Sequence, residues 1–301
     1  MAAALIDGAA LARRLNDELK VKVEALADAG VVPRLAVILV GDDPASHTYV
    51  RSKSRAARSV GIDSVEHRLD ASVGEAELLA LVDRLNHDPD TDGILIQLPL
   101  PKQIDVTKVL RAVHPAKDVD GFHPTNVGER VTGAGGIIPC TPMGAMFLIE
   151  TVRSNIEGLD AVVIGMSNIV GKPMADLLLS AGCTVTVAHI KTVGLPAICK
   201  RADIVVVAVG KPGLVRAEWI KPGAIVIDVG INRIVTSDGE KRLVGDVAFE
   251  EAAGVAGAIT PVPGGVGPMT IACLLLNTFQ AALGRRGAEL RAGRESARLV
   301  R

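Results

Sequence analysis

The stretch VVIGMSNIVGKPMADLLL, residues 162–179, decides the fold class of the chain. It places a β-branched apolar run before a turn bounded by Gly165 and Gly171, and an apolar helical pattern after that turn. A strand, a glycine-bounded turn and a helix put backbone N–H groups and a helix N-terminus where a pyrophosphate binds. The stretch is neither a GxGxxG motif nor a Walker A loop, because Lys172 is followed by proline rather than Ser or Thr. It therefore predicts dinucleotide binding and argues against nucleotide hydrolysis.

The same alternation of strands and helices extends along most of the 301 residues. Short runs with few polar residues alternate with segments of helical period, which predicts parallel strands with helices on both faces. The predicted strands are 35–41, 64–69, 93–101, 160–165, 183–189, 204–210 and 224–230. The predicted helices are 43–61, 74–88, 141–154, 170–182 and 268–283.

A glycine- and proline-rich stretch, GAGGIIPCTP at 133–142, separates two such series. We therefore predict an α/β fold with two α/β domains flanking a cleft, the second a Rossmann-like doubly wound parallel sheet. The first domain is expected to span residues 1–140 and the second, which would bind the dinucleotide, residues 141–267. The last helix, 268–284, is expected to complete the first domain, and the charged tail 285–301 to be loosely held.

The composition excludes several classes of protein. A net charge of −1 gives no basic balance for nucleic acid, and the apolar runs are far shorter than the roughly 20 residues of a membrane span. The N-terminus lacks the basic-then-apolar pattern of a signal peptide, so we expect a cytoplasmic protein with neither a membrane nor a nucleic-acid partner. The cysteines Cys140, Cys183, Cys199 and Cys273 lack metal-ligand spacing. We expect them to be buried reduced thiols and expect no metal site.

The segment DPASHTYVRSKSRA, residues 43–56, holds the single tyrosine of the chain, Tyr49, four positions before Lys53. On a helix this spacing places both side chains, together with Ser46, on one face. A lysine with the ordinary pKa of about 10.4 is a poor base at neutral pH, and it becomes useful only where burial or a neighbouring cation lowers that value. The spacing alone fits a solvated amphipathic helix equally well, because several arginines lie nearby.

Three further features each have a structural and a functional interpretation. Gln97 interrupts the apolar strand GILIQLPLP near its carboxyl end, where ligands bind in open α/β sheets, although a buried amide is also satisfied inside a core. Asp120 precedes Gly121 in a common turn dipeptide. The segment PVPGGVGPMT, 261–270, either brings its backbone close to a ligand through its glycines or simply begins the last helix.

The end of the predicted strand 183–189 bears on the choice of dinucleotide. An NAD site usually offers a carboxylate to the ribose hydroxyls about 20 residues beyond the glycine turn. Here the sequence is AHIKT, residues 188–192, which contains Lys191 and no carboxylate. A basic or neutral strand end tolerates a 2′-phosphate, so we expect NADP to be the cofactor.

Together these motifs resemble those of the bifunctional methylenetetrahydrofolate dehydrogenase/cyclohydrolase family of bacterial one-carbon metabolism. The matching stretches are GDDPASHTYVRSKSRA, GILIQLPLP, KDVDGFHPTNVG, IPCTPMG, VVIGMSNIVGKPM, AIVIDVGIN and ITPVPGGVGPMT, in family order over about residues 1–284. The resemblance implies reversible oxidation of 5,10-methylenetetrahydrofolate to the 5,10-methenyl form with NADP, followed by hydrolysis to 10-formyltetrahydrofolate. It also implies a homodimer, and a folate-binding role for the first domain.

The resemblance further implies roles for individual residues. Lys53 would be the central catalytic residue, with Tyr49 lining and orienting the folate. Gln97 would hydrogen-bond near Lys53, and Asp120 would bind the pterin edge. The residues implied to contact substrate are Tyr49, Lys53, Ile96, Gln97, Leu98, Asp120, Pro263, Gly264, Gly265, Val266 and Gly267. The residues implied to contact the dinucleotide are Gly165, Met166, Ser167, Ile190 and Ile231.

One position departs from the family pattern. Many NADP-using members carry an arginine where this chain has Met166, and a guanidinium can hold the 2′-phosphate. Lys191 and Lys172 are the candidates to replace it, and we expect weaker discrimination between NADP and NAD. Two other functions stay open on the sequence: a dehydrogenase without cyclohydrolase activity, and a dinucleotide-binding protein without turnover.

Overall fold

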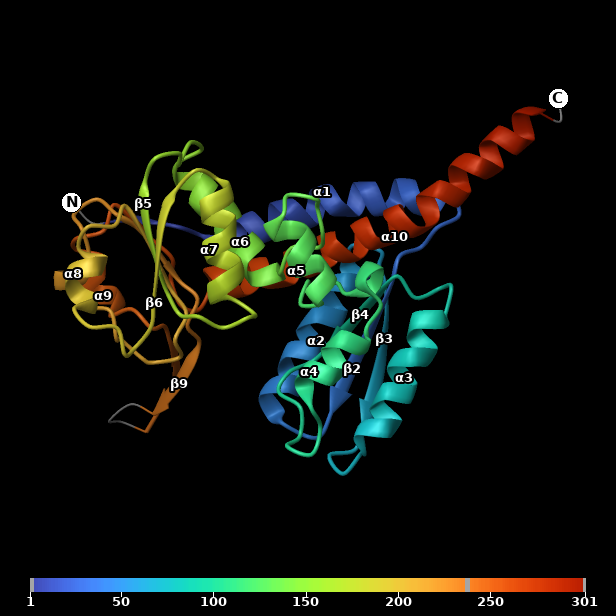
Figure 1. Ribbon diagram of the computed structural model, residues 1–301, viewed down its shortest axis with the longest axis horizontal. Coiled ribbons are helices and arrows are strands. Elements are labelled where there is room, and N and C mark those ends of the chain that lie inside the picture. Colours follow the sequence, from blue (N-terminus) through green and yellow to red (C-terminus); the bar gives the residue numbers. More distant parts are fainter. Residues whose placement is uncertain (1–2, 236–238, 300–301) are drawn as a thin grey trace. The chain divides into compact units, whose positions relative to one another are not determined.

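The computed structural model describes residues 3–235 and 239–299 (Figure 1). The chain divides into two compact units, each assembled from stretches that are distant in the sequence. We call them the six-stranded unit, Met1–Arg13 with Pro139–Cys273, and the three-stranded unit, Arg14–Ile138 with Leu274–Arg301. Helices α1 (Gly8–Asp28) and α10 (Val266–Leu299) each contribute to both.

The three-stranded unit contains a parallel sheet in the order β3-β2-β4. Its strands are β2 (Arg34–Val40), β3 (Asp63–Leu69) and β4 (Gly93–Ile96). Its other helical segments are α2 (Pro44–Ser59), α3 (Glu75–His87), α4 (Val106–Ala112), the 3-10 turn η1 (Pro115–Lys117) and α5 (Pro124–Val131). Leucines and valines of α3 and α4 form one core with alternate residues of β2 and β4, while α2 contacts β2 and β3. Because helices cover both faces of this sheet, the sequences of its central strands are unbroken apolar runs.

Helix α2 begins and ends at positions with a local cause. The Asp43 carboxylate accepts a hydrogen bond from Ser46 N at 2.8 Å, and Pro44 occupies the first turn, where its missing N–H has no consequence. At the other end Gly61 has a φ of +84°, which glycine adopts without strain. The helix predicted over 43–61 is thus confirmed, and with it the shared face of Tyr49 and Lys53.

The six-stranded unit has an all-parallel sheet in the order β1-β11-β8-β7-β5-β6. Its strands are β1 (Ala4–Leu5), β5 (Asp160–Ile164), β6 (Thr184–Ala188), β7 (Ile204–Val207), β8 (Ile225–Asp228) and β11 (Ala258–Ile259). Its helical segments are α6 (Cys140–Val152), α7 (Gly171–Ser180), α8 (Leu195–Cys199), η2 (Ala217–Trp219) and α9 (Phe249–Ala252). The chain runs from β5 to β6 and then returns to β7 on the other side of β5, so the strand order reverses between β5 and β7. This is the doubly wound, Rossmann-like arrangement that the sequence predicts.

The structure differs from the predicted domain limits at both ends of the chain. Strand β1 pairs with β11, so residues up to Arg13 group with the six-stranded unit rather than with the first series of strands. Strands β1 and β11 have two residues each, too few to show a periodic pattern. An antiparallel hairpin of β9 (Asn232–Val235) and β10 (Lys241–Val244) was also not predicted.

Helix α10 carries the second difference. The structure continues this helix to Leu299, beyond the predicted end at 284, in keeping with the high helix propensity of Ala, Arg, Glu and Leu in the tail sequence. Its part Val266–Arg286 is long and apolar enough to cross a membrane by length and composition, but 56% of its most apolar window is buried inside the protein, as in a core helix. The four cysteines are free and buried, which confirms the expectation for them.

Candidate functional site

Lys53, Tyr49 and Gln97 meet at the carboxyl end of the three-stranded sheet. The Lys53 side chain is only 7% exposed, and its Nζ donates a hydrogen bond to Gln97 Oε1 at 3.1 Å. The same Nζ lies 5.9 Å from the centroid of the Tyr49 ring. Burial raises the pKa of the Tyr49 phenol, which therefore stays protonated at neutral pH and can donate a hydrogen bond. An amine, a phenol and an amide thus lie close together on partly or fully buried side chains.

Gln97 is held so that its oxygen faces Lys53. Its Nε2 donates to Leu98 O at 2.8 Å, and its backbone N donates to Ile38 O at 2.9 Å, which continues the pairing of β2 with β4 by one residue. The amide nitrogen is therefore engaged, and Oε1 is left to accept from the lysine. β4 itself ends at Ile96, earlier than predicted, because the prolines that follow have no N–H for the ladder.

Asp120 lies at the same edge of this sheet. A parallel bridge joins Ile94 of β4 to Asp118, and Gly121 N then donates to Asp118 O at 3.1 Å, so Asp120 lies in a turn directly after this bridge. Gly121 follows with a φ of +71°, so the turn that the dipeptide predicts is present. The structure thus joins Lys53 to Gln97 by a hydrogen bond, and it places Asp120 in a turn next to the residue that pairs with β4.

Three residues that the sequence did not single out hold this turn. The buried carboxylate of Asp118 accepts from His123 N at 2.7 Å and from Asn126 Nδ2 at 2.9 Å. Asn277 of α10 donates from its Nδ2 to Val119 O at 2.8 Å and to Ile138 O at 2.9 Å. A polar residue inside the apolar run CLLLNTFQAAL is the signal that would have identified Asn277, as it identified Gln97.

In the six-stranded unit, the turn after β5 leaves no room for side chains at two positions. A Cβ on Gly165, whose φ is +136°, would lie 2.4 Å from Ala208 O at the end of β7. A Cβ on Gly171 would lie 2.1 Å from Gly165 O. The turn therefore packs tightly at the point where the strand order reverses, which is where ligands bind in doubly wound sheets.

The residues around this turn present both polar and apolar groups. Ser167 Oγ accepts from Val170 N at 3.1 Å and from Gly171 N at 3.3 Å, and so caps the N-terminus of α7. Met166, Ile190 and Ile231 are exposed at the carboxyl ends of β5, β6 and β8. A nucleotide binds where apolar side chains contact its rings and polar backbone groups contact its phosphates. The exposed apolar side chains and the glycine turn beside them provide both kinds of contact at one place.

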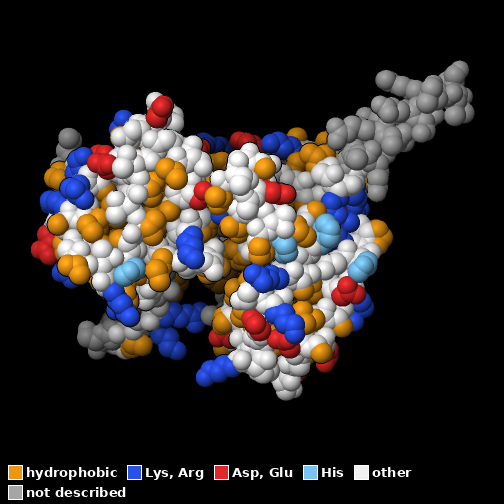
Figure 2. Space-filling model, in the orientation of Figure 1, with side chains coloured by type: hydrophobic (Ala, Val, Ile, Leu, Met, Phe, Trp, Pro, Cys, Tyr) orange, Lys and Arg blue, Asp and Glu red, His pale blue; other side chains and the backbone are white. Residues whose placement is uncertain are grey.

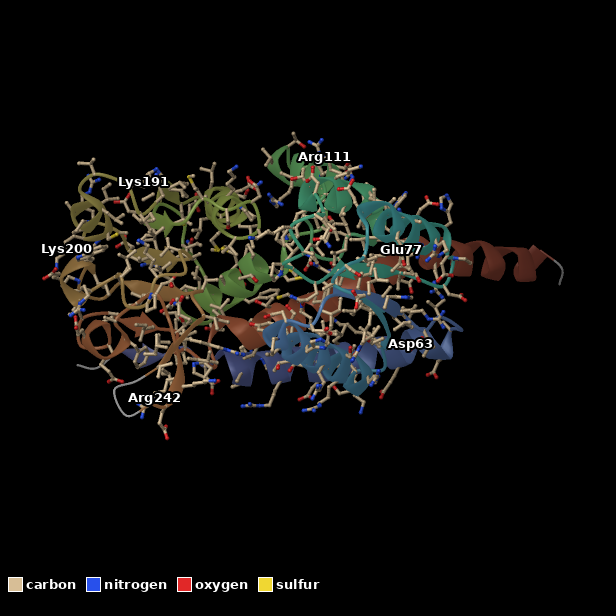
Figure 3. The ribbon with its side chains drawn as sticks, turned by 90° about the horizontal axis from the view of Figure 1, so that it is seen from below. Asp63, Glu77, Arg111, Lys191, Lys200 and Arg242 are labelled. Atoms are coloured by element: carbon tan, nitrogen blue, oxygen red, sulfur yellow. The ribbon has the colours of Figure 1, made fainter. Side chains whose placement is uncertain are left out.

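Two lysines that lie close in sequence to the glycine turn and to the end of β6 are candidates to bind the 2′-phosphate of the dinucleotide. Lys172 Nζ donates to Asn168 Oδ1 at 2.7 Å on the first turn of α7. Lys191 is exposed on the loop between β6 and α8 (Figure 3) and has no salt bridge within the described part of the chain. Its amine is therefore the less engaged of the two.

The segment Pro263–Gly267 is packed against the start of α1. Ala9 N donates to Gly264 O at 2.9 Å, and Gly264 has a φ of +105°. A Cβ on Gly8 would lie 1.9 Å from Gly265 O, so this helix approaches as closely as only glycine allows. A cavity of about 610 Å³ at the carboxyl ends of β8 and β11 adjoins the segment, with Asp228, Arg242 of β10 (Figure 3) and Val262 in its walls.

The candidate residues therefore form two sets. Lys53, Tyr49, Gln97 and Asp120 belong to the three-stranded unit, and the glycine turn and Pro263–Gly267 belong to the six-stranded unit. Among the residues that the structure describes, no group of three or more His, Cys, Asp or Glu side chains could hold a metal ion. The groups present are suited to hydrogen bonding, proton transfer and nucleotide binding.

Comparisons with known proteins agree with this division. Residues 6–120 match the model of the tetrahydrofolate dehydrogenase/cyclohydrolase catalytic domain, and residues 139–286 match the NAD(P)-binding domain of the same family. The bifunctional protein FolD 1 of Rhizorhabdus wittichii is 59% identical over 288 residues, which cover 95% of this chain and 97% of that protein.

Solved structures give the same relationship. The bifunctional enzyme FolD, methylenetetrahydrofolate dehydrogenase/cyclohydrolase, from Campylobacter jejuni has a TM-score of 0.91 at 50% identity, with 94% of this chain and 100% of that chain covered. The N5,N10-methylenetetrahydrofolate dehydrogenase-cyclohydrolase from Trypanosoma brucei, solved in complex with NADP cofactor and inhibitor, has a TM-score of 0.89 at 41% identity. Here 94% of this chain and 98% of that chain are covered.

Proposed function

Because the chain belongs to the tetrahydrofolate dehydrogenase/cyclohydrolase family, we propose that Lys53, Tyr49 and Gln97 form its catalytic group. It is an NADP-dependent methylenetetrahydrofolate dehydrogenase and a methenyltetrahydrofolate cyclohydrolase. It oxidises 5,10-methylenetetrahydrofolate to the 5,10-methenyl form, and then hydrolyses that product to 10-formyltetrahydrofolate. The observation that supports the catalytic group best is the hydrogen bond from the buried Lys53 Nζ to Gln97 Oε1 at 3.1 Å.

The six-stranded unit fits NADP. The glycine turn after β5 exposes backbone where any side chain would collide, and it leads to the N-terminus of a helix, which attracts phosphate. We assign to this site Gly165, Met166, Ser167, Ile190 and Ile231. When bound, the cofactor supplies the hydride acceptor, and the protein supplies binding and orientation.

The 2′-phosphate of NADP needs a cation that Met166 cannot provide. We assign this role to Lys191, because it is exposed and lacks a salt bridge within the described part of the chain, whereas Lys172 already donates to Asn168. The flexible ammonium of a lysine binds phosphate less specifically than the planar guanidinium of an arginine, which donates two hydrogen bonds at once. We therefore expect a preference for NADP over NAD that is weaker than in relatives with an arginine at this position.

We assign contacts with the folate to Tyr49 and Asp120 of the three-stranded unit. The Tyr49 ring lines the pterin, and the Asp120 carboxylate accepts hydrogen bonds from its amino edge, since a carboxylate is the matching acceptor for that group. The remaining assigned contacts come from Ile96, Leu98, Pro263, Gly264, Gly265, Val266 and Gly267. Among these the glycines leave backbone open to close approach by a ligand.

The hydrolysis is assigned to Lys53. The methenyl product is a cation whose bridging carbon is already electrophilic, so water attacks it once a proton acceptor is at hand. In the proposed step the water oxygen bonds to that carbon while one of its protons passes to the lone pair of the Lys53 amine. The bond from this carbon to N5 of the folate then breaks as the remaining hydroxyl proton moves to N5, which leaves the formyl group on N10. Gln97 Oε1, which accepts from Nζ, orients the amine for this transfer.

The two activities are tested separately with the purified protein. Reduction of NADP that requires methylenetetrahydrofolate, together with hydrolysis of methenyltetrahydrofolate in the absence of NADP, is the expected result. Reduction of NADP with hydrolysis no faster than in buffer would indicate a dehydrogenase alone. Binding of NADP without either reaction would indicate a dinucleotide-binding protein.

We also propose a cytoplasmic homodimer that forms through β6. This strand lies at one edge of the sheet, and Val187 on it and Leu179 on the preceding helix are exposed. Hydrophobic side chains gather on the face that carries β6 and α7 (Figure 2), and exposed patches of this kind mark interfaces. We expect Val187→Lys to be a monomer by light scattering, and Val193→Lys, on the loop outside the strand, to remain a dimer.

A further inference from the structure

Two buried carboxylates in the six-stranded unit have no part in the function just proposed. Asp228 is the last residue of β8, and Asp246 follows the hairpin of β9 and β10. They are 3% and 0% exposed, and neither forms a salt bridge with the described Lys, Arg or His residues. A buried carboxylate without a cation is costly, so the compensation must come from the donors around it.

Those donors are almost all backbone N–H groups of loops. Asp246 Oδ2 accepts from Val209 N at 2.7 Å and Gly210 N at 2.9 Å, and its Oδ1 accepts from Asn232 Nδ2 at 2.8 Å. The loop after β7 and the loop after β8 are thereby joined through one side chain.

Asp228 completes the connection. Its Oδ1 accepts from Gly230 N at 3.0 Å and Asp246 N at 2.9 Å, and its Oδ2 accepts from Val247 N at 2.8 Å. Ile231 therefore lies between Gly230, held by Asp228, and Asn232, held by Asp246. The exposed Ile231 side chain is presented by a backbone that is fixed on both sides.

Glycines make this arrangement sterically feasible. A Cβ on Gly245 would lie 1.8 Å from Asp228 Oδ2, and a Cβ on Gly230 would lie 2.3 Å from the Asp246 carboxylate. Both carboxylates thus reach backbone N–H groups only because their neighbours lack side chains.

We propose that Asp246 and Asp228 are positioning residues for the dinucleotide: they fix the loops after β7 and β8 so that Ile231 and the backbone near Gly210 meet the cofactor. This inference rests on the proposed cofactor site. Preorganised loops lower the cost of ordering on binding, so their release weakens affinity for NADP without touching the hydrolytic group.

Asp246→Asn is the decisive variant. An amide has one acceptor oxygen where the carboxylate has two, so the variant cannot accept from both the Val209–Gly210 backbone and Asn232. We expect the KM and the Kd for NADP to rise about tenfold. Hydrolysis of methenyltetrahydrofolate without NADP is expected to stay within about twofold of wild type.

Two further variants control for folding and geometry. Asp203→Asn changes a carboxylate at the amino ends of β5 and β7, away from the carboxyl ends where Asp228 and Asp246 lie. Asp203 accepts from Asp160 N and pairs with Lys221, and its substitution should leave the affinity for NADP unchanged. Asn232→Asp added to Asp246→Asn restores a donor–acceptor pair and should recover part of the affinity. The fluorescence of Trp219, the single tryptophan, reports whether the six-stranded unit is folded.

The outcomes separate the two proposals. A Kd for NADP in Asp246→Asn equal to that of Asp203→Asn overturns the positioning role, and so does a parallel fall in both activities. If Ile231→Ala leaves the affinity for NADP unchanged, the assigned cofactor site itself is wrong. Should Asp246→Asn fail to fold by tryptophan fluorescence, Asn232→Ala removes a single contact to Asp246, and unchanged affinity in that variant would also overturn the inference.

Discussion

Replacing Lys53 with methionine separates the chemical role of its amine from its structural role. Methionine keeps an unbranched apolar side chain, so the packing of the buried stem survives while Nζ is lost. The structure gives the amine one side-chain hydrogen bond, to Gln97 Oε1, and one ring contact, to Tyr49. Loss of one such bond costs about 1 kcal/mol, and loss of the ring contact about 0.5 kcal/mol, so the protein should stay folded.

The effect on hydrolysis should be much larger. Removing a positioned proton acceptor slows a reaction by about 10²- to 10⁴-fold, which corresponds to about 3–5 kcal/mol of transition-state stabilisation. We therefore expect hydrolysis of methenyltetrahydrofolate to fall at least about 100-fold, while the free energy of unfolding falls by less than about 2 kcal/mol. The expected loss of transition-state stabilisation is therefore larger than the expected loss of folding stability. Rate measurements and urea unfolding can tell the two apart.

The assay follows the absorbance of the methenyl form without NADP, alongside urea unfolding of the same preparation. Lys108→Met is the matched control, because Lys108 is an exposed lysine of the same unit whose partner is Glu75 on α3. That variant should hydrolyse at the wild-type rate. A Lys53→Met rate within about tenfold of wild type would refute the role assigned to the amine.

Three other perturbations test the rest of the structure. Gly171→Ala should raise the KM for NADP at least about tenfold and leave the KM for the folate unchanged in steady-state kinetics, because the new Cβ would lie 2.1 Å from a backbone carbonyl of the preceding turn. Asp92→Ala should lower the free energy of unfolding by about 3 kcal/mol, since this buried carboxylate accepts from both Arg285 and Arg286. Urea titrations measure this loss, and a loss below about 1 kcal/mol would contradict the expectation. Burial, with nearby Arg285, lowers the pKa of Lys117 to about 8, so between about pH 8 and pH 10 the unfolded chain binds more protons than the native one. Stability should therefore rise by about 2 kcal/mol over that range, and Lys117→Met should abolish the rise.

Local rules placed Lys53 on a helix face and Gln97 near the end of a strand, but the contact between them was expected only from the resemblance to the family. The four-residue spacing on α2 places Tyr49 and Lys53 on one face, and the carboxyl ends of parallel strands share one edge of a sheet. The strand predicted over 93–101 placed Gln97 near a carboxyl end, and the structure shows that this strand pairs with β2. The doubly wound sheet and the tight turn at Gly165 follow in the same way from short-range patterns.

The residues that hold the site in place could not be predicted from the sequence, because they contact residues that are far away along the chain. Asn277 and Val119 are 158 residues apart, and no local pattern relates them. The role of Asp246 could be inferred only once the structure had shown which N–H groups after β7 and β8 donate to it. Strands β1 and β11 were missed because two residues carry no period, and so the pairing of residues 4–5 with β11 was not predicted.

The division of the three-stranded unit between Arg14–Ile138 and Leu274–Arg301 has a consequence for translation. Asn277 and Arg286 leave the ribosome only after the whole six-stranded unit has been made, yet they bind Val119 and Asp92 near the start of the chain. The nascent polypeptide therefore carries Lys53 and Gln97 for most of its synthesis without the segment that closes their fold. A chain truncated before residue 274 lacks Asn277 and Arg286, and with them the contacts by which α10 binds Val119 and Asp92.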